Sequence, residues 1–87
     1  MFEQINEPVR VLSVCEAPAK GLDGKLTPLQ FFWQNREFQV KTINLAYSVR
    51  EGRSKVYYFA VSDSANYFKL KFDPEALKWT LIETYVE

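Results

Sequence analysis

Apolar side chains recur at every second residue along most of this chain, a period typical of β-strands that bury one face. The alternation is clearest at Phe68, Leu70 and Phe72, which are interleaved with Tyr67, Lys69 and Lys71. We expect further strands where the same period or a short apolar run occurs: 9–16, 29–33, 36–42, 56–61 and 79–86. Because 56–61 is apolar on both faces, that strand is expected to be central in the sheet or covered on both sides.

Short polar intervals separate these segments and predict the turns. Gln34-Asn35 lies between two alternating runs and predicts a hairpin, because Asn tolerates the left-handed backbone of a tight turn. Asp23-Gly24 predicts another tight turn. Asp73-Pro74 fits a helix cap followed by proline at the first helical position, which predicts one short turn over 74–77.

The phase of the apolar positions changes after Thr42. Up to this point the apolar residues of the alternating run have even numbers. After it they have odd numbers, at Ile43, Leu45, Tyr47 and Val49. A continuous strand cannot do this and keep one buried face. Either a β-bulge restores the register or a short helix spans 41–48; we favour the helix slightly, because Leu and Ala are good helix formers.

Size and composition are compatible with one domain over residues 1–87. Forty-seven per cent of the residues are apolar and 16% are aromatic, which is enough for a hydrophobic core in so short a chain. The sequence therefore predicts a mainly β fold, or a β-dominated α+β fold. Five or six antiparallel strands would form a curved sheet or small barrel, with the one short helix near 41–48.

The residue inventory argues against catalysis. The chain has no histidine, the commonest general base and metal ligand, and only one cysteine. Cys15 lies among apolar residues and is interpreted as a small buried hydrophobe. No glycine-rich phosphate loop and no calcium-loop spacing is present. We expect no enzyme activity, no metal and no cofactor.

Charge and targeting signals indicate a cytoplasmic protein without membrane association. Eleven basic and eleven acidic side chains cancel, so no overall field attracts nucleic acid or anionic lipid. The N-terminal residues lack the basic and apolar regions of a secretory signal. No apolar run approaches the roughly 20 residues of a membrane span.

Aromatic and basic side chains on the later strands are the candidate binding residues. Tyr57, Phe59, Lys69 and Lys71 fall on one register, so pairing of 55–61 with 66–72 would place them on one face of the sheet. Tyr67 is interleaved with the same lysines, and Arg50 and Arg53 add a basic turn. Stacking rings beside amines favour single-stranded nucleic acid, whereas exposed aromatics at neutral charge favour a protein partner. The third interpretation, which we favour, is that a helix, a long loop or the barrel interior covers the aromatics and that the lysines protect a sheet edge.

Aromatic and turn residues follow one another over about three-quarters of the chain, in the order Asp23-Gly24, Pro28-x-x-Phe31-x-Trp33-x-x-Arg36-x-Phe38-x-Val40, Tyr58-Phe59, Tyr67-Phe68-x-Leu70 and Trp79-x-Leu81-x-x-x-Tyr85. This order resembles an uncharacterised family of small bacterial β-domains, some of which are attached to error-prone Y-family DNA polymerases. The chain departs from that family at Gln34-Asn35, where Arg-Gly is common. It departs again at 44–48, where a Trp-Arg pair is frequent.

The resemblance implies a bacterial, all-β domain and supplies no activity and no functional residue. Taken with the residue inventory, it leads to two hypotheses. The first is a non-catalytic accessory domain that binds an unidentified protein partner. The second is a single-stranded nucleic-acid module linked to DNA metabolism, which rests on the aromatic and lysine residues.

Overall fold

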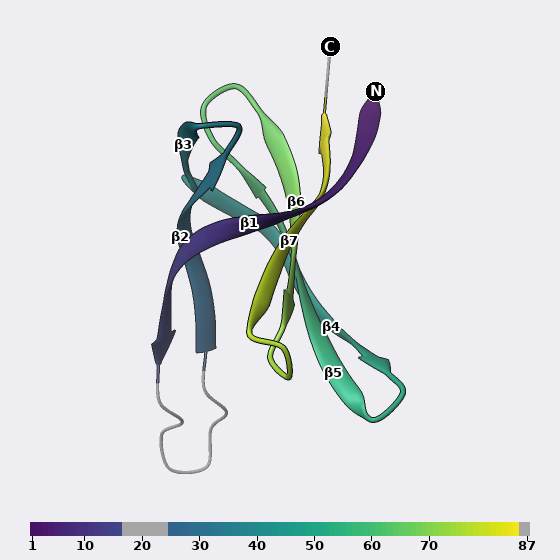
Figure 1. Ribbon diagram of the computed structural model, residues 1–87. Coiled ribbons are helices and arrows are strands. Elements are labelled where there is room, and N and C mark those ends of the chain that lie inside the picture. The colour runs from purple at the N-terminus through teal and green to yellow at the C-terminus, as the bar shows by residue number, and fades with distance from the viewer. Residues whose placement is uncertain (17–24, 86–87) are drawn as a thin grey trace.

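The computed structural model describes residues 1–16 and 25–85 of the chain, and the turn predicted at Asp23-Gly24 lies outside these residues. In the described part, seven strands form one antiparallel sheet (Figure 1). Along the chain the strands are β1 (Phe2–Glu16), β2 (Lys25–Trp33), β3 (Arg36–Gln39), β4 (Thr42–Glu51), β5 (Ser54–Ser62), β6 (Tyr67–Asp73) and β7 (Lys78–Tyr85). Across the sheet their order is β3-β2-β1-β7-β6-β5-β4.

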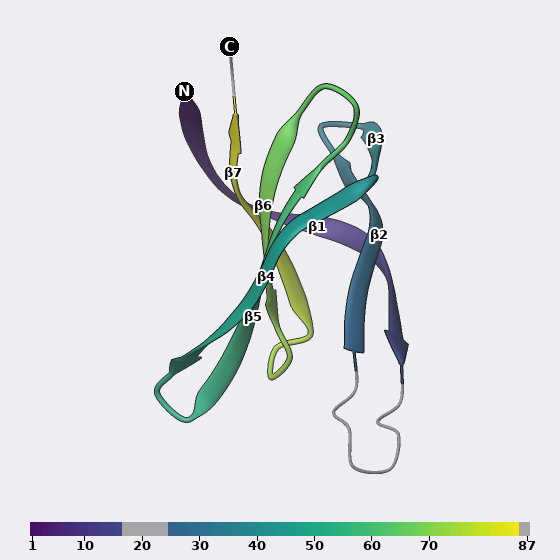
Figure 2. The same ribbon diagram turned by 180° about the vertical axis from the view of Figure 1, so that it is seen from behind.

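The long strand β1 connects the two parts of the sheet. Its first half, from Phe2 to Val9, pairs with β7, and its second half, from Arg10 to Glu16, pairs with β2. The β1–β7 register shifts between Gln4 and Glu7, where Asn6 adopts a positive φ of 52°. Such bulges bend a strand and increase its twist. The strand accordingly sweeps across the molecule in both views (Figures 1 and 2).

The sheet curls into an open half-barrel around an aromatic core. The Phe31 ring lies 4.9 Å from that of Phe68, and the Phe38 ring lies 5.0 Å from it, although β2 and β3 are far from β6 in the strand order. Leu70 and Leu81 are fully buried beside these rings. Burying each such side chain stabilises the fold by about 1.5–3 kcal/mol, which favours a curled sheet over a flat one.

The hairpin predicted at Gln34-Asn35 is confirmed. Trp33 pairs with Arg36 across the turn, and both central residues have positive φ, 52° and 59°. Two successive positive φ angles give the turn a twist that matches the flanking strands. The mainly β fold with antiparallel strands is confirmed as well.

The helix predicted near 41–48 is wrong, and the alternative of a β-bulge is the one observed. Ile43 pairs with Val61 and Leu45 with Ala60, so Asn44 is the extra residue that changes the phase. The Asn44 side-chain amide donates a hydrogen bond to Ser62 Oγ over 3.3 Å. Pairing with β5 along the whole segment outweighs the local helix propensity of Leu and Ala. This strand, β4, raises the count above the five or six strands expected.

The segment after Asp73 forms a turn. Asp73 Oδ1 accepts hydrogen bonds from the backbone N–H groups of Glu75 and Ala76, as a capping residue does. Leu77 then adopts a positive φ of 53°, which reverses the chain into β7 before a helix begins. The cap prediction is therefore correct in its contacts.

Candidate functional site

Pairing between β5 and β6 decides which aromatic residues share a face with the lysines. Tyr58 pairs with Lys71 and Ala60 with Lys69, so Tyr58 is the aromatic residue beside them. Phe59 is only 4% exposed and belongs to the core. The neighbouring Tyr57 is half-buried and packs against the same core. The expected shared face of Tyr57, Phe59, Lys69 and Lys71 is therefore wrong: the two aromatics point inward and the two lysines outward.

On the outward side, two tyrosines stack and the lysines lie over them. The rings of Tyr47 and Tyr58 are 5.2 Å apart at an interplanar angle of 13°. Lys69 Nζ lies 5.6 Å from the centre of the Tyr47 ring and 5.3 Å from that of Tyr58. Lys71 Nζ lies 5.9 Å from the Tyr58 ring. Cation–π contacts of this kind favour positions of the lysine amines over the tyrosine rings.

An acidic side chain lies near each of the two lysines. Lys71 Nζ is 3.3 Å from Glu51 Oε1, and the Tyr58 hydroxyl donates to the same oxygen over 3.3 Å. Hydrogen bonding to Glu51 raises the pKa of Lys71. Hydrogen bonding to Tyr47 raises the pKa of Lys69, and the charge of Glu83, its cross-strand partner, acts in the same direction. The lysines stay charged, yet the surface around them has little net charge.

Further aromatics extend this surface across the sheet. The ring of Tyr85 contacts those of Phe2 and Tyr67 edge-on, with centroid distances of 5.2 and 6.3 Å. Leu45 is 56% exposed and Tyr67 is 53% exposed. We call this surface the outer face; its side chains are Phe2, Leu45, Tyr47, Val49, Tyr58, Tyr67, Lys69, Lys71 and Tyr85. It includes a hollow of about 300 Å³ lined by Leu45, Tyr47, Tyr67 and Lys69 among others.

The outer face ends at an open strand. Among residues 1–16 and 25–85, β4 pairs with no strand other than β5. In Figures 1 and 2 the β4–β5 hairpin extends away from the β1–β2 hairpin. The first eight residues of β4, Thr42–Val49, carry no charge. A strand with an unpaired backbone edge is a template for another strand.

Other open edges in the described chain are shorter or carry charges. The outer strand β3 has four residues, which include Arg36 and Glu37. The half of β1 from Arg10 to Glu16 pairs with β2 alone and has a charged residue at each end. Short length and charge are two devices by which proteins protect sheet edges. The longest uncharged edge is therefore that of β4.

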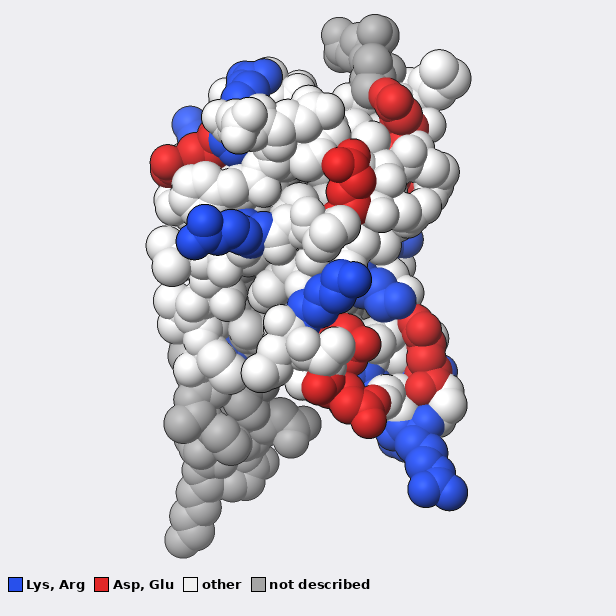
Figure 3. Space-filling model, in the orientation of Figure 1, with Lys and Arg blue, Asp and Glu red and all other residues white. Residues whose placement is uncertain are grey.

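The basic turn between β4 and β5 is separate from the outer face. Arg50 pairs with Lys55, whose Nζ lies 5.6 Å from the Tyr57 ring on the inward side of the hairpin. Arg53 is exposed in the turn itself, beside Gly52 with its φ of 63°. The basic turn of Arg50 and Arg53 therefore lies apart from Lys69 and Lys71. On the side shown in Figure 3, basic and acidic side chains are interleaved.

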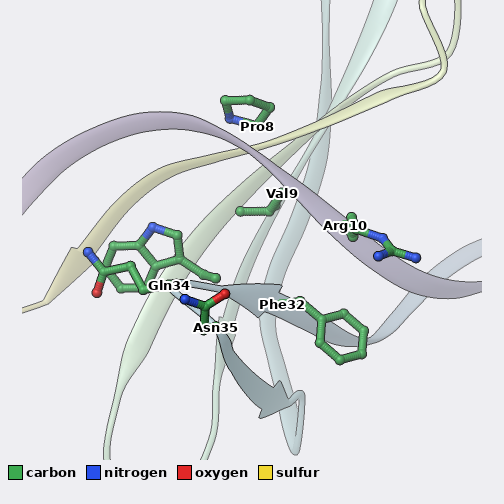
Figure 4. A pocket seen from close by; sticks show the side chains of 7 residues that line it. Pro8, Val9, Arg10, Phe32, Gln34 and Asn35 are labelled. Atoms are coloured by element: carbon green, nitrogen blue, oxygen red, sulfur yellow. The ribbon is translucent and has the colours of Figure 1, made fainter.

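A second hollow, of about 560 Å³, lies where β1 crosses the β2–β3 hairpin (Figure 4). Phe32 and Val9 supply apolar surface, and Arg10, Gln34 and Asn35 bring polar groups to it. Trp33 Nε1 is buried here without a hydrogen-bond partner in the described residues. A buried N–H donor of this kind suits an acceptor group of a ligand.

Cys15 is exposed, contrary to the expected burial, because this end of β1 lies beyond the part paired with β7. Within the described ranges, no three His, Cys, Asp or Glu side chains are grouped so that they would hold a metal ion. Nor does this part of the chain contain a helix that is long and apolar enough to cross a membrane.

Comparison with protein-family models, with curated proteins and with solved structures finds no match to this chain. The resemblance to polymerase-associated β-domains and the cytoplasmic location therefore stay predictions. Sequence reasoning did not single out Tyr47 and Tyr58 as site residues. The signal for Tyr47 was the phase change after Thr42, which under the bulge interpretation places Leu45, Tyr47 and Val49 together on one face of a strand.

Proposed function

We propose that this chain is a non-catalytic protein-interaction domain that binds an extended segment of a partner along β4. The observation that carries the proposal is the open edge of β4, which has eight uncharged residues and pairs with β5 alone in the part of the chain that the structure describes. An added strand would take up hydrogen-bonding groups of the β4 backbone that do not face β5. This backbone pairing is the source of affinity in strand addition.

The side chains beside the edge supply specificity. Leu45, Tyr47 and Val49 project from β4 onto the outer face. Alternate side chains of an added strand would lie next to them, because residues opposite one another in a sheet share a face. The 300 Å³ hollow next to Leu45 and Tyr47 is suited to an apolar or aromatic side chain of the partner. The low net charge of the surface favours such a partner over a polyanion.

A second candidate function is binding of single-stranded nucleic acid on the outer face. The observation in its favour is the position of Lys69, whose Nζ lies over both stacked tyrosines. Bases stack on such rings, and amines contact the phosphates. Glu51 and Glu83 lie beside the two lysines and would repel phosphates, so we rank this function second. Binding of labelled oligothymidylate that weakens steeply with salt would support it.

Selection of peptides tests the first function. A library of random extended peptides is selected on the immobilised chain, and binding is measured by fluorescence anisotropy at low and high salt. We expect apolar, strand-forming peptides whose affinity changes little with salt. Tyr47→Lys should abolish binding, because a lysine on the edge opposes strand addition. Val14→Lys is the matched control, since Val14 is 45% exposed on the edge of β1. Peptides that bind Tyr47→Lys as well as the original chain would contradict the proposal.

A further inference from the structure

We infer that the strand which pairs with β4 is β4 of a second copy of this chain, an inference that rests on the proposed strand-binding function. Two copies would pair antiparallel about a two-fold axis perpendicular to the sheet, with Tyr47 at the axis. An isologous contact of this kind requires that the strand be complementary to itself. The five residues Leu45–Val49 of β4 satisfy that requirement when Tyr47 lies at the axis.

In this register, apolar residues lie opposite apolar residues on the outer face. Tyr47 lies opposite its own counterpart, and Leu45 of each copy lies opposite Val49 of the other. On the inward face, Ala46 lies opposite Ser48, a pair of small residues. Directly opposite side chains are 4.5–5.5 Å apart at Cβ, and apolar or aromatic pairs at that spacing stabilise a sheet.

Neighbouring registers are less complementary. Because the axis is perpendicular to the sheet, residues that lie opposite each other must point to the same side of the sheet. The pairing can therefore shift only by two residues at a time, which moves the axis from one residue to the next. Over a segment of the same five residues, moving the axis to Ser48 places Ala46 opposite the charged Arg50. Moving it to Ala46 brings the bulge at Asn44 into the paired segment, which interrupts the ladder. Centred on Tyr47, the five residues Leu45–Val49 pair without a charge and without the bulge, whereas Asn44 and Ile43 lie opposite Arg50 and Glu51 beyond the ends of this segment.

The aromatic stack of each copy supports the same axis. Within one copy, Lys71, Tyr58 and Tyr47 lie side by side across β6, β5 and β4. Pairing at Tyr47 joins the two rows, so that four tyrosine rings would lie between two lysines. The net charge of zero means that the copies do not repel each other as they approach. The zero net charge of the chain and the side-chain pattern of β4 are therefore both compatible with a second copy of the chain as the partner.

Sedimentation velocity of the full chain tests this inference. We expect a species of twice the chain mass of 10.2 kDa that dissociates on dilution. Tyr47→Lys and, independently, Leu45→Lys should give monomers, because each places lysines at or near the axis. Val14→Lys should remain dimeric. Urea unfolding of all three variants verifies that they are folded. A dimer that survives both β4 variants, or that is lost in Val14→Lys, overturns the inference.

Disulfide trapping tests the register. In a Cys15→Ser background, Tyr47→Cys should form a cross-linked dimer under mild oxidation, whereas Ala46→Cys and Ser48→Cys should not. Preferential cross-linking at either neighbour would overturn the register. A chain that is monomeric at all concentrations would overturn self-pairing. Peptide binding that Tyr47→Lys abolishes would still support the strand-binding function, so the two failures are distinguishable.

Discussion

Tyr47 and Tyr58 stack across β4 and β5 with ring centroids 5.2 Å apart, and Lys69 lies over both rings. This stack connects the open edge of the sheet with the charged residues of β6. A strand that adds to β4 would lie directly beside Tyr47. The stack therefore makes β4 and the outer face one continuous surface.

The two faces of the sheet are expected to respond differently to truncation. Phe59→Ala removes a ring from the core and should lower the free energy of unfolding by about 3–5 kcal/mol. Tyr47→Ala removes a ring that is 36% exposed, and the lost stacking should cost only about 0.5–1.5 kcal/mol. Urea unfolding of both variants measures the difference. Equal costs would contradict the assignment of Phe59 to the inward face and Tyr47 to the outward face.

The hairpin turn at Gln34-Asn35 gives a second prediction. Asn35 has a φ of 59°, a conformation that a β-branched residue adopts only with strain. Asn35→Val should therefore destabilise the domain by roughly 1–2 kcal/mol. Asn35→Gly is the control and should keep or slightly raise stability, since glycine adopts positive φ without strain. Thermal or urea unfolding distinguishes the two variants, and a neutral effect of valine would refute the turn geometry.

Asp63 makes stability depend on pH. Burial tends to raise the pKa of its carboxyl group, but hydrogen bonds from the backbone N–H groups of Ala65 and Asn66 outweigh this effect and lower it below 3.8. A lowered pKa in the folded state means that the ionised group stabilises the fold above the unfolded value, and that this contribution is lost as the pH falls through the folded value.

The variant Asp63→Ala measures that contribution. We expect the chain to be more stable than Asp63→Ala at neutral pH, because the variant loses the hydrogen bonds that Asp63 accepts. The difference should stay constant down to about pH 5 and shrink below the unfolded pKa of about 4. Urea unfolding at a series of pH values provides the test. A difference that grows on acidification would show that the pKa of Asp63 is raised instead.

The strand pattern was predictable because most strands keep one strict period of two. Phe68, Leu70 and Phe72 are a clear example, and all three are found on the inward face. The hairpin at Gln34-Asn35 was predictable for a similar reason, since only a few residue types tolerate its backbone. In both cases the information is local, within a few residues of the sequence.

The predictions that were wrong concern features that are set by pairing between strands and not by the local sequence. Whether 43–49 is a helix or a bulged strand is decided by β5, which supplies backbone partners that the local sequence does not reveal. The length of the loop between β5 and β6 sets the pairing register of the two strands. It therefore decides which side chains of β5 share a face with Lys69 and Lys71. That loop brings Tyr58 opposite Lys71, one residue away from the predicted alignment with Tyr57 and Phe59.

Amide hydrogen exchange along β4 tests the central claim, that this open edge binds another strand. Backbone N–H groups that face the open edge exchange rapidly in a free strand and are protected when a partner strand covers them. We predict that raising the protein concentration, or adding a selected peptide, protects alternate amides between Leu45 and Glu51. Unchanged exchange in β4, with new protection between Arg10 and Glu16 instead, would contradict the claim.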